Sequence, residues 1–524
     1  MSFFNELRKN IDEINNLQKT ENGAVGYKTT GKKLLDMNFS IPKYRKANEA
    51  EIIADFEQSF NENEILAILW MFFARDVRGG LGERRLFRIL FNWFCKEHTK
   101  YAKELLECVA EYGRWDDLVK ATDNTPVWDD AVVLIKKQLT EDLLNFEASK
   151  SISLLAKWLP SERTSSQKTR ILARKLAKAL SINIADYNRI CVKLRKYLDV
   201  TEIKMSAKEW ENINYSTVPS GANVKYNNAF LRNDEERRRA YLESLKKGET
   251  KINASALFPH DIVHKYSKNS YWHGSVGSYD EALEQLWKAL PDMGGLENTI
   301  VVADGSGSMT CRVDPNSTTS ALEVANGLAL YCAEHCKGEF KDKYITFSSR
   351  PQFVDLSNKI SLHDKLAEAY RHDECSNTDI QAVFDLILHT ATSTNAKQED
   401  IPKTILIVSD MEFDAATSTG GWYGSSSSLT PSLFKVIDRK YKEAGYQLPR
   451  LVFWNVNSRT GTIPMKENDL GVTLVSGFSI SIVQMVQNGE TDPYLNLVKV
   501  LMGDRYMPIC AKLLGNTFNK ENYK

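Results

Sequence analysis

The sequence lacks three features that would place it in a common class at once: a net charge, a long apolar run and closely paired cysteines. Its 524 residues include 68 basic and 68 acidic side chains, which excludes a generally basic coat for nucleic acid and an acidic solvating tail. No stretch approaches the roughly 18 apolar residues of a membrane helix, so no membrane contact is expected. Charges interrupt the segment MSFFNELRKN, which therefore does not resemble a signal peptide.

The eight cysteines are scattered and form no CxxC pair, which predicts reduced, mostly buried thiols in a cytoplasmic protein. Cys332 and Cys336 share a predicted helix face, and His260 and His264 lie one helical turn apart. A zinc site at the cysteines needs further ligands nearby, and the histidines lack the adjacent glutamate of a zinc hydrolase. Ordinary burial and a helix start are the favoured interpretations of these two pairs.

Proline, glycine and low-complexity sequence are sparse in the first 292 residues, where helical periodicity prevails. Apolar residues recur with the helical period in ranges such as 130–147, 167–181, 184–197 and 234–246. Short amphipathic helices joined by short turns favour a repeat-like α-solenoid or an irregular helical array. We therefore predict an all-helical region over residues 1–292.

The pattern changes at a plausible linker, residues 291–295, after which short apolar strands alternate with helices. Strands are predicted at 300–303, 344–347, 404–408 and 450–455, with helices at about 319–336, 362–371, 379–392 and 432–445. Such alternation indicates a mainly parallel, doubly wound sheet covered on both faces, with 352–356 as an antiparallel edge. The predicted fold class is α + α/β, with an α/β domain at 297–480 and a C-terminal helical extension at 481–524 packed on one of the two parts.

The first of these strands ends in an acid that is followed by small hydroxyl residues, in the segment NTIVVADGSGSMT. Alternation in this glycine loop aims the side chains of Asp304, Ser306 and Ser308 at one point. Thr378 begins a helix and Asp410 ends another strand, so both should reach the same sheet edge. Two carboxylates and three hydroxyls form a hard oxygen set suited to Mg²⁺ or Mn²⁺.

Neutral hydroxyl ligands leave the charge of such a cation weakly compensated, so it can attract an outside carboxylate or phosphate oxygen. This chemistry favours adhesion over catalysis, and we expect a protein that is not an enzyme. The alternative is that DGSGS is only a glycine turn, because short motifs often occur by chance. The preceding strand, the following helix, the loop threonine and the second strand-end aspartate argue together against that alternative.

The DGSGSM segment, with the later threonine and aspartate, resembles the metal-ion-dependent adhesion site (MIDAS) of von Willebrand factor A domains. The resemblance covers about 297–480 and implies that Asp304, Ser306, Ser308, Thr378 and Asp410 hold the metal. The sequence departs from the commonest pattern in two places, because Met411-Glu412 follows Asp410 and no glycine precedes Thr378. Several acids crowd the predicted rim and should disfavour an acidic partner in the absence of metal: Asp373, Glu374, Asp379, Glu412 and Asp414.

The helical part carries motifs such as ARDVRGGLGERRLF, YGRWDDLV, LLAKWLPS and ALFPHDIV. These resemble a family of unknown function that joins a helical region to a C-terminal von Willebrand A domain. The layout is similar to that of the Ro autoantigen (TROVE) class, whose helical-repeat ring binds structured and misfolded small RNAs. The resemblance therefore implies a Ro-like ribonucleoprotein.

Two basic features of the helical region are possible RNA contacts. In RDVRGGLGERR, backbone amides with Arg78, Arg84 and Arg85 could hold a phosphate, although a tight interhelical turn with pairing to Asp76 and Glu83 is the favoured interpretation. Residues 151–200 contain 11 basic and 3 acidic side chains. The densest basic set there is Lys168, Arg170, Arg174, Lys175, Lys178, Lys193, Arg195 and Lys196.

Within this set, Arg170, Arg174 and Lys178 recur every fourth residue and form one stripe on a helix. Tyr187 and Tyr197 lie nearby in sequence and could stack on unpaired bases. An ordinary solvated helix face is the alternative interpretation. Farther along, the Gly/Ser-rich segment 415–432 follows the Asp410 loop, and its Trp422 and Tyr423 are either partner-binding anchors or part of a surface insertion.

The predicted function is binding, with RNA held by the helical region and a protein partner recruited through Mg²⁺ by an acidic side chain. The alternative is a metal-dependent scaffold or assembly factor that binds no nucleic acid. A metal-dependent hydrolase is a weaker third hypothesis, because metal ligation would occupy both aspartates that could act as acid and base.

Overall fold

The computed structural model describes residues 3–268, 274–347, 350–373, 377–415, 432–487 and 489–514. The chain forms two compact units. Unit 1 comprises Met1–Asn48, Asp55–Glu64 and Leu257–Val500, and unit 2 comprises Glu49–Ala54, Ile65–Ala256 and Leu501–Lys524. The domain boundary that the sequence suggests at residue 292 lies within unit 1, and the segment 481–524 contributes to both units.

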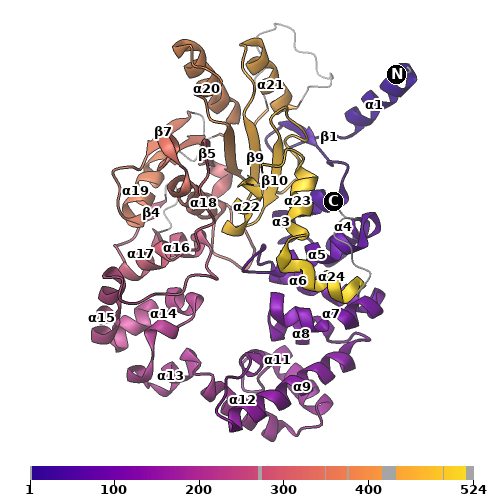
Figure 1. The fold of residues 1–524 in the computed structure, drawn as a ribbon, viewed down its shortest axis with the longest axis vertical. Coiled ribbons are helices and arrows are strands. Elements are labelled where there is room, and N and C mark those ends of the chain that lie inside the picture. The colour runs from indigo at the N-terminus through magenta and orange to yellow at the C-terminus, as the bar shows by residue number, and fades with distance from the viewer. Residues whose placement is uncertain are drawn as a thin grey trace. The chain divides into compact units, whose positions relative to one another are not determined.

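Unit 1 is organised around a six-stranded sheet with the spatial order β10-β9-β8-β5-β6-β7 (Figure 1). All neighbouring strands are parallel except β6 and β7, so β7 is the antiparallel edge that the sequence predicts. The strands are β5 (Thr299–Asp304), β6 (Lys343–Phe347), β7 (Gln352–Asp355), β8 (Thr404–Ser409), β9 (Arg450–Asn455) and β10 (Val472–Ser476). A helical region followed by a mainly parallel sheet is therefore confirmed.

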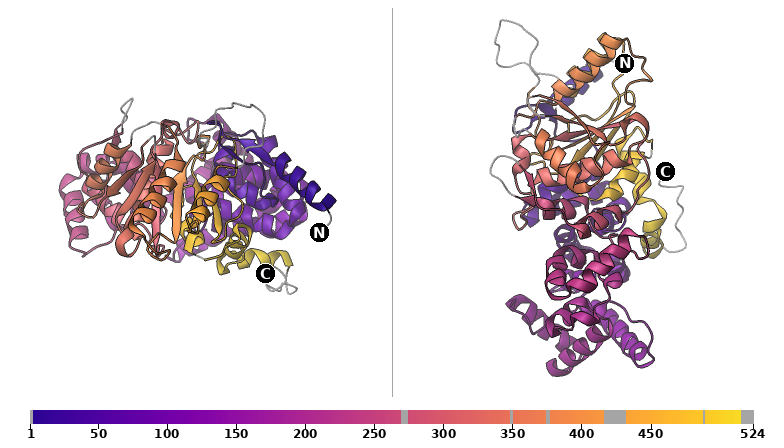
Figure 2. Two further views of the ribbon diagram at one scale, coloured as in Figure 1. Left: turned by 90° about the horizontal axis from the view of Figure 1, so that it is seen from above. Right: turned by 90° about the vertical axis from the view of Figure 1, so that its left-hand side faces the viewer.

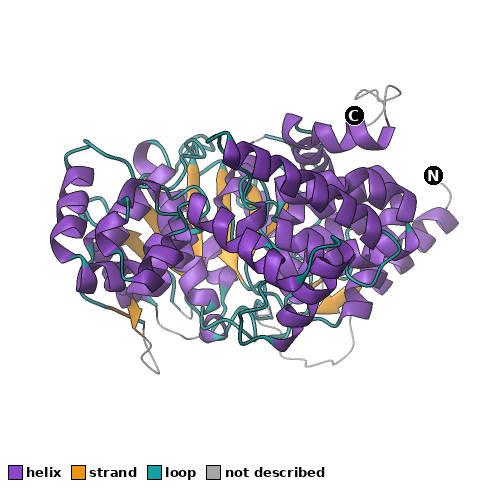
Figure 3. Ribbon diagram, turned by 90° about the horizontal axis from the view of Figure 1, so that it is seen from below, coloured by secondary structure: helices purple, strands orange, loops and turns teal. Residues whose placement is uncertain are grey.

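Strands β5, β8 and β10 are buried at every residue, which explains why their sequences are apolar without alternation. The helices that flank the sheet are α18 (Ala321–His335), α19 (Leu362–His372), α20 (Ile380–Thr394) and α21 (Leu433–Glu443). Helices α18 and α19 pack against each other, as do α20 and α21. Figure 3 shows the strands lying among helices. Phe434 of α21 meets Phe453 of β9 edge-on, with ring centroids 4.8 Å apart.

Two short hairpins interrupt the otherwise helical part of unit 1 before residue 292. These are β1 (Leu17–Lys19) with β2 (Val25–Tyr27), and β3 (Ser267–Lys268) with β4 (Ser275–Val276). The helices of unit 1 outside the sheet flanks are α1 (Phe3–Asn15), α2 (Lys33–Phe39), α3 (Ile41–Tyr44), α16 (Pro259–Tyr266), α17 (Glu281–Lys288), α22 (Val483–Gln487) and α23 (Pro493–Leu501). Helix α4 (Glu49–Glu62) is divided between the two units.

The described part of unit 2 contains helices and turns but no strand, and its helices follow one another along the chain (Figure 2). They are α5 (Glu64–Arg75), α6 (Arg84–Glu97), α7 (Thr99–Tyr112), α8 (Trp115–Thr122), α9 (Trp128–Glu147), α10 (Leu155–Trp158), α11 (Gln167–Ala179), α12 (Ile184–Tyr197), α13 (Thr201–Ala207), α14 (Ser220–Asn233), α15 (Glu235–Lys246) and α24 (Met507–Leu514). Phe72 of α5 forms edge-on ring contacts with Phe87 and Tyr112 in the core of this unit. Throughout the described chain, none of the helices has both the length and the apolar character needed to cross a bilayer.

Candidate metal-binding site

The strand order of the sheet reverses between β5 and β8. From β5 the chain continues to β6 and β7 on one side, and from β8 it continues to β9 and β10 on the other. Ligands of doubly wound sheets bind at such a switch point, beyond the carboxyl ends of the strands. Asp304 ends β5 and Asp410 directly follows β8, and these two strands are parallel neighbours. The structure therefore brings the two predicted aspartates to adjacent strand ends.

The loop after β5 is folded around the Asp304 carboxylate. The Ser306 amide donates to Oδ1 at 2.9 Å, and the Ser409 hydroxyl donates to Oδ2 at 2.6 Å. The hydroxyl oxygens of Ser306 and Ser308 lie 3.1 Å apart. Asp304 and Ser306 are buried, whereas Ser308 is partly exposed. Three predicted residues thus converge in one loop, joined by Ser409, which sequence reasoning does not single out.

Asp410 is fully buried, and one of its carboxylate oxygens lacks a hydrogen-bond donor among the described residues. Its Oδ1 accepts from the Glu412 amide at 3.1 Å. Its Oδ2 is the oxygen without a donor, and Arg459 Nη1 lies 3.4 Å from it. Oδ2 thus forms an ion pair with Arg459 but accepts no hydrogen bond, and its negative charge would also attract a metal cation.

Met411 adopts a backbone conformation that normally favours glycine. Its φ is 61°, in the left-handed region, and it stands where the adhesion-site motif most often has glycine. The Met411 side chain is fully buried, so apolar packing offsets the backbone strain at this position. Although methionine stands where the motif most often has glycine, the backbone after Asp410 therefore adopts the conformation that glycine would favour.

Three carboxyl groups in this region resist ionisation. Burial, reinforced by the charge of Asp410, raises the pKa of Asp304 to about 7. Burial also raises the pKa of Asp410, although the Arg459 guanidinium opposes the shift. Asp373, whose Oδ1 would lie 3.0 Å from a Cβ atom on Gly305, has its pKa raised by burial to about 7. A divalent cation would favour the ionised forms of nearby carboxylates.

These raised pKa values predict that the metal-free protein loses stability as the pH rises. The pKa values of Asp304 and Asp373 are higher in the folded chain than in the unfolded chain, where the pKa of an aspartate is about 3.9. The folded chain therefore binds these protons more tightly. Their stabilising contribution is complete below that value and is lost as the pH rises through about 7. In EDTA, we expect the melting temperature to fall between about pH 5 and pH 8. Asp373→Asn, which cannot ionise, should reduce that slope in thermal melts, and an unchanged slope would contradict the assignment.

Thr378 is buried beside the Asp410 loop. Its hydroxyl lies 3.1 Å from the Glu412 carbonyl oxygen and 2.9 Å from Asp414 Oδ1, and Asn22 Nδ2 donates to that hydroxyl at 2.9 Å. Within the described ranges, Thr378 forms no hydrogen bond with the serines of the β5 loop. The structure thus brings Thr378 to the Asp410 side of the predicted set.

The β1–β2 hairpin, which lies in the region predicted to be helical, contributes to the same edge of the sheet. The Glu21 amide donates to the Glu412 carboxylate at 2.9 Å, and Asn22 Nδ2 donates to the Glu412 carbonyl at 2.6 Å. Gly23 has a φ of 92°. The dipeptide Asn22-Gly23 is a hairpin turn signal, so the sequence did contain evidence for this element.

Two of the acids expected to crowd the rim are buried and accept hydrogen bonds from the protein. The Glu412 carboxylate accepts from the amides of Arg459 and Thr460 at 2.9 and 3.0 Å. Asp373 accepts from Asn326 Nδ2 at 2.8 Å. Neither side chain presents its charge to solvent.

The remaining rim acids are also engaged, and basic residues accompany them. Asp379 caps the N-terminus of α20, Asp414 binds the loop threonine, and Glu374 lies outside the described residues. Lys46 is exposed and Arg459 is partly exposed at the same edge, and their positive charges influence each other. Glu412 and Asp373 are thus shielded from solvent, whereas Asp379 and Asp414 are partly exposed, so the expected repulsion of an acidic partner stays a prediction.

The donor set fits a hard cation better than a softer metal. Among the described residues, no group of three or more His, Cys, Asp and Glu side chains could hold a metal ion, which also removes support from both zinc alternatives. A metal at the switch point therefore depends on hydroxyl ligands. The unsatisfied Asp410 Oδ2 and the converging oxygens of Ser306 and Ser308 suit Mg²⁺ or Mn²⁺.

The glycine loop between α5 and α6 is a tight turn, as its favoured interpretation predicts. The amides of Leu81 and Glu83 donate to the carbonyls of Phe73 and Ala74 at 3.1 and 2.7 Å. A Cβ atom on Gly80 would lie 1.9 Å from the Phe73 carbonyl oxygen, so only glycine fits there. These two amides therefore bind the protein itself, and a phosphate held by the amides that begin α6 stays a prediction.

One of the two acids expected to pair with the arginines of this turn has a partner that is distant in sequence. Asp76 is buried and binds Arg505, whose Nη2 lies 2.8 Å from Oδ1, so its main partner is distant in sequence. Arg78, Arg84 and Arg85 are exposed, as RNA contacts need to be.

Several residues of the predicted basic set have partners within unit 2. Arg174 pairs with Glu162 at 2.8 Å, and Lys175 pairs with Asp123. Arg195 donates to two backbone carbonyls at 2.7 and 2.8 Å, at the end of α10. Arg195 is therefore a structural residue in this chain.

The rest of the basic set lies at the surface. The exposed members are Lys168, Arg170, Arg174, Lys178, Lys193 and Lys196. Tyr187 is buried and its hydroxyl donates to the Pro160 carbonyl at 2.7 Å, so the prediction that it stacks on bases is wrong. Tyr197 stays at the surface, with its ring edge-on to Phe146. The predicted partner-binding pair, Trp422 and Tyr423, lies outside the described residues.

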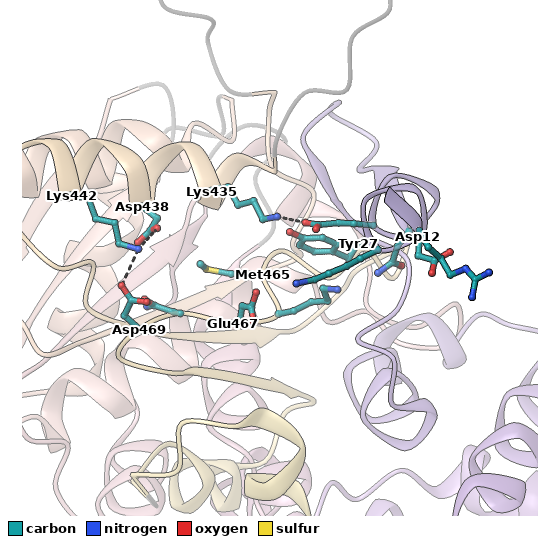
Figure 4. A pocket seen from close by; sticks show the side chains of 14 residues that line it. Asp12, Tyr27, Lys435, Asp438, Lys442, Met465, Glu467 and Asp469 are labelled. Carbon is teal, nitrogen blue, oxygen red and sulfur yellow. Dashed lines mark hydrogen bonds and ion pairs between the residues drawn. The ribbon is translucent and has the colours of Figure 1, made fainter. Parts of the chain in front are cut away.

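A cavity of about 910 Å³ lies elsewhere in unit 1, between α1, the residue Tyr27 and α21 (Figure 4). None of the five predicted metal ligands lines it. Its lining carries five basic and five acidic side chains, among which Lys435 binds Glu13 and Lys442 lies 2.9 Å from both Asp438 and Asp469. The cavity therefore shows no preference for a cation or an anion.

Comparisons with known proteins divide the chain near the linker that the sequence predicts at residues 291–295. Residues 298–497 match the family model of a domain of unknown function, DUF7788, and residues 121–293 match that of another, DUF2828. The chain is also similar to Uncharacterized protein L728 of Acanthamoeba polyphaga mimivirus, with 29% identity over 527 residues that cover 93% of this chain and 87% of the relative. The two matched ranges are separated at the linker that the sequence predicts.

Proposed function

We propose that this chain is a non-enzymatic binding protein whose unit 1 is a von Willebrand A-like domain with a metal-ion-dependent adhesion site. The strand order and the antiparallel edge support a doubly wound domain of this kind. Asp304, Ser306, Ser308, Thr378 and Asp410 would hold Mg²⁺ or Mn²⁺. The bound cation would supply a positive coordination position for an acidic side chain of a protein partner.

The observation that carries the metal proposal is the state of Asp410. Its Oδ2 is buried without a hydrogen-bond donor at the switch point, on the strand next to the one that ends in Asp304. Lys46 and Arg459 at the same edge favour an anionic partner over a cationic one. Binding is favoured over catalysis because metal ligation would occupy both aspartates that could serve as acid and base.

RNA binding by the helical unit is the second half of the proposal. The exposed lysines and arginines of α11 and α12 support it, because a run of exposed positive charge suits a phosphate backbone. The layout shared with the Ro class suggests structured or misfolded small RNA as the ligand. A metal-dependent scaffold without nucleic acid is the alternative that experiments must separate from it.

Calorimetric titration of the purified full chain with MnCl₂ tests the metal half. We expect one site per chain, competed by MgCl₂ and abolished by EDTA, with affinity rising between about pH 6 and pH 8 because the metal displaces protons. Absence of heat, together with an undiminished signal of free Mn²⁺ in electron paramagnetic resonance, would remove the adhesion site from the proposal.

A gel-shift titration with a fluorescent hairpin RNA at low salt tests the second half. Binding that weakens steeply with added salt supports RNA recognition through phosphates. If the protein retains EDTA-sensitive protein partners but shifts no RNA, the scaffold alternative replaces the ribonucleoprotein.

A further inference from the structure

Three segments that are distant in sequence meet in unit 2 and bring several arginines together. Arg84 begins α6, Arg114 directly precedes α8, and Trp158 ends α10. Helix α8 packs against both α6 and α10. The Arg114 guanidinium lies over the Trp158 ring, 4.2 Å from its centroid. We name Arg84, Arg114 and Trp158 the arginine site.

The carboxylates beside the arginine site already have other partners. Asp117 is buried and binds Arg75 Nε at 2.8 Å and Arg88 Nε at 2.6 Å. Asp116 binds Arg88 Nη2 at 2.7 Å and Lys120 Nζ at 3.1 Å. Three positive side chains thus contact these two carboxylates, although Asp116 Oδ1 accepts no hydrogen bond.

Arg84 and Arg114 form no ion pair among the described residues, and the charges of Asp116 and Asp117, which attract both, are shared with Arg75, Arg88 and Lys120. Partial burial, together with the neighbouring guanidinium groups of Arg84 and Arg75, lowers the pKa of Arg114 to about 10. Partial burial and the positive charge of Arg75 also lower the pKa of Arg84. The two side chains therefore lie in a region of excess positive potential.

Helix stability does not explain this arrangement. Arg114 is the N-cap residue of α8 and Arg84 is the first residue of α6, and neither cap has a side-chain hydrogen bond. A positive side chain at a helix N-terminus opposes the helix dipole and is unfavourable by several tenths of a kcal/mol to about 1 kcal/mol. The helix dipole therefore does not account for the two charges. Arg114 gains a cation–π contact with Trp158 within the protein, and an external anion is the partner that would balance the remaining positive charge.

We infer that the arginine site binds a phosphate group of an RNA strand; this inference rests on the proposed RNA binding by unit 2. The planar guanidinium groups of Arg84 and Arg114 match the oxygens of a phosphate. Trp115 and Trp158 are partly exposed beside them and offer aromatic surface to an attached base. The same unit also carries the exposed lysines of α11, which are further candidates for phosphate contacts.

The test compares the double variant Arg84→Gln/Arg114→Gln with the matched control Arg239→Gln. Arg239 is also an exposed arginine of unit 2, but it pairs with Glu235 at 2.8 Å on α15. The probe is a fluorescent single-stranded oligouridylate, titrated by anisotropy into the full chain over a range of salt. We expect the double variant to bind at least about tenfold more weakly, with the log–log salt slope reduced by about 0.7 for one lost phosphate contact. The control should match the unmodified protein in both measurements.

A second variant, Arg84→Lys/Arg114→Lys, keeps the charge but loses the planar guanidinium group. Its affinity should lie between those of the unmodified chain and the glutamine variant. Thermal melting of each variant shows whether the fold is intact. If the unmodified chain binds the oligouridylate and the glutamine variant retains its affinity and slope, the arginine site is overturned while RNA binding stands.

Inorganic phosphate separates this inference from the proposed function. Protection of the chain from thermal unfolding by phosphate, lost only in the glutamine variant, supports an anion site at these residues. If the unmodified chain binds no RNA, the proposed RNA function fails. If phosphate nevertheless protects a chain that binds no RNA, the arginine site binds an anion, and RNA as its source is overturned.

Discussion

Asp410→Asn should abolish manganese binding, with a loss of affinity of at least about 100-fold. Replacement of residues that only support a metal ligand typically costs 10- to 100-fold, and Asp410 is proposed as a ligand itself. The substitution is nearly isosteric, and it removes a charge whose burial is unfavourable, so the chain should fold. Calorimetric titration with MnCl₂ measures the effect, and Asp304→Asn should reproduce it.

Arg459→Gln provides a control of opposite sign. Its guanidinium lies 3.4 Å from Asp410 Oδ2 and repels a cation at that oxygen, so its removal should tighten manganese binding about three- to tenfold. Asp469→Asn, which removes an exposed carboxylate paired with Lys442, should leave the affinity unchanged. A loss in Asp469→Asn as large as that in Asp410→Asn would show that the signal reports general surface charge and not a site at the switch point.

The sequence predicts the sheet and its strand-end aspartates because both depend on local patterns. Continuous apolar runs such as Ile300–Ala303 and Thr404–Val408 indicate strands buried on both faces, and the confirmed parallel sheet follows from their alternation with helices. An acid at the end of such a strand must then lie at the sheet edge. The sequence alone therefore places Asp304 and Asp410 at the same sheet edge, before any contact between segments is known.

The residues that sequence reasoning misses are those whose role depends on contacts between distant segments. The strands of the β1–β2 hairpin have three residues each, too few for an alternating pattern, although Asn22-Gly23 marks the turn. Tyr187 and Arg195 lie on a helix whose buried face is set by its neighbours, so periodicity alone does not show that both bind backbone carbonyls. Asp76 pairs with Arg505, a partner that no local pattern can indicate.

Asp117→Asn should produce the largest loss of stability in unit 2, about 3–5 kcal/mol. Asp117 is completely buried and binds the buried Arg75 guanidinium through Nε at 2.8 Å and Nη2 at 2.7 Å. Gly113 allows this close packing, because a Cβ atom there would lie 2.9 Å from Asp117 Oδ2. Removing the carboxylate charge leaves Arg75 buried without its counter-ion, and breaking a buried pair in this way is strongly destabilising.

Urea denaturation of the full chain, followed by tryptophan fluorescence, measures the loss at Asp117. Trp115 and Trp158 lie close to this ion-pair network and should report its unfolding. Glu235→Gln breaks a pair in which both side chains are mostly exposed, so it should change the free energy of unfolding by less than about 1 kcal/mol. If Asp117→Asn costs no more than this control, the network contributes little to stability. A small loss would also mean that Arg75 has another counter-ion. The excess of positive charge at the arginine site would then need another explanation.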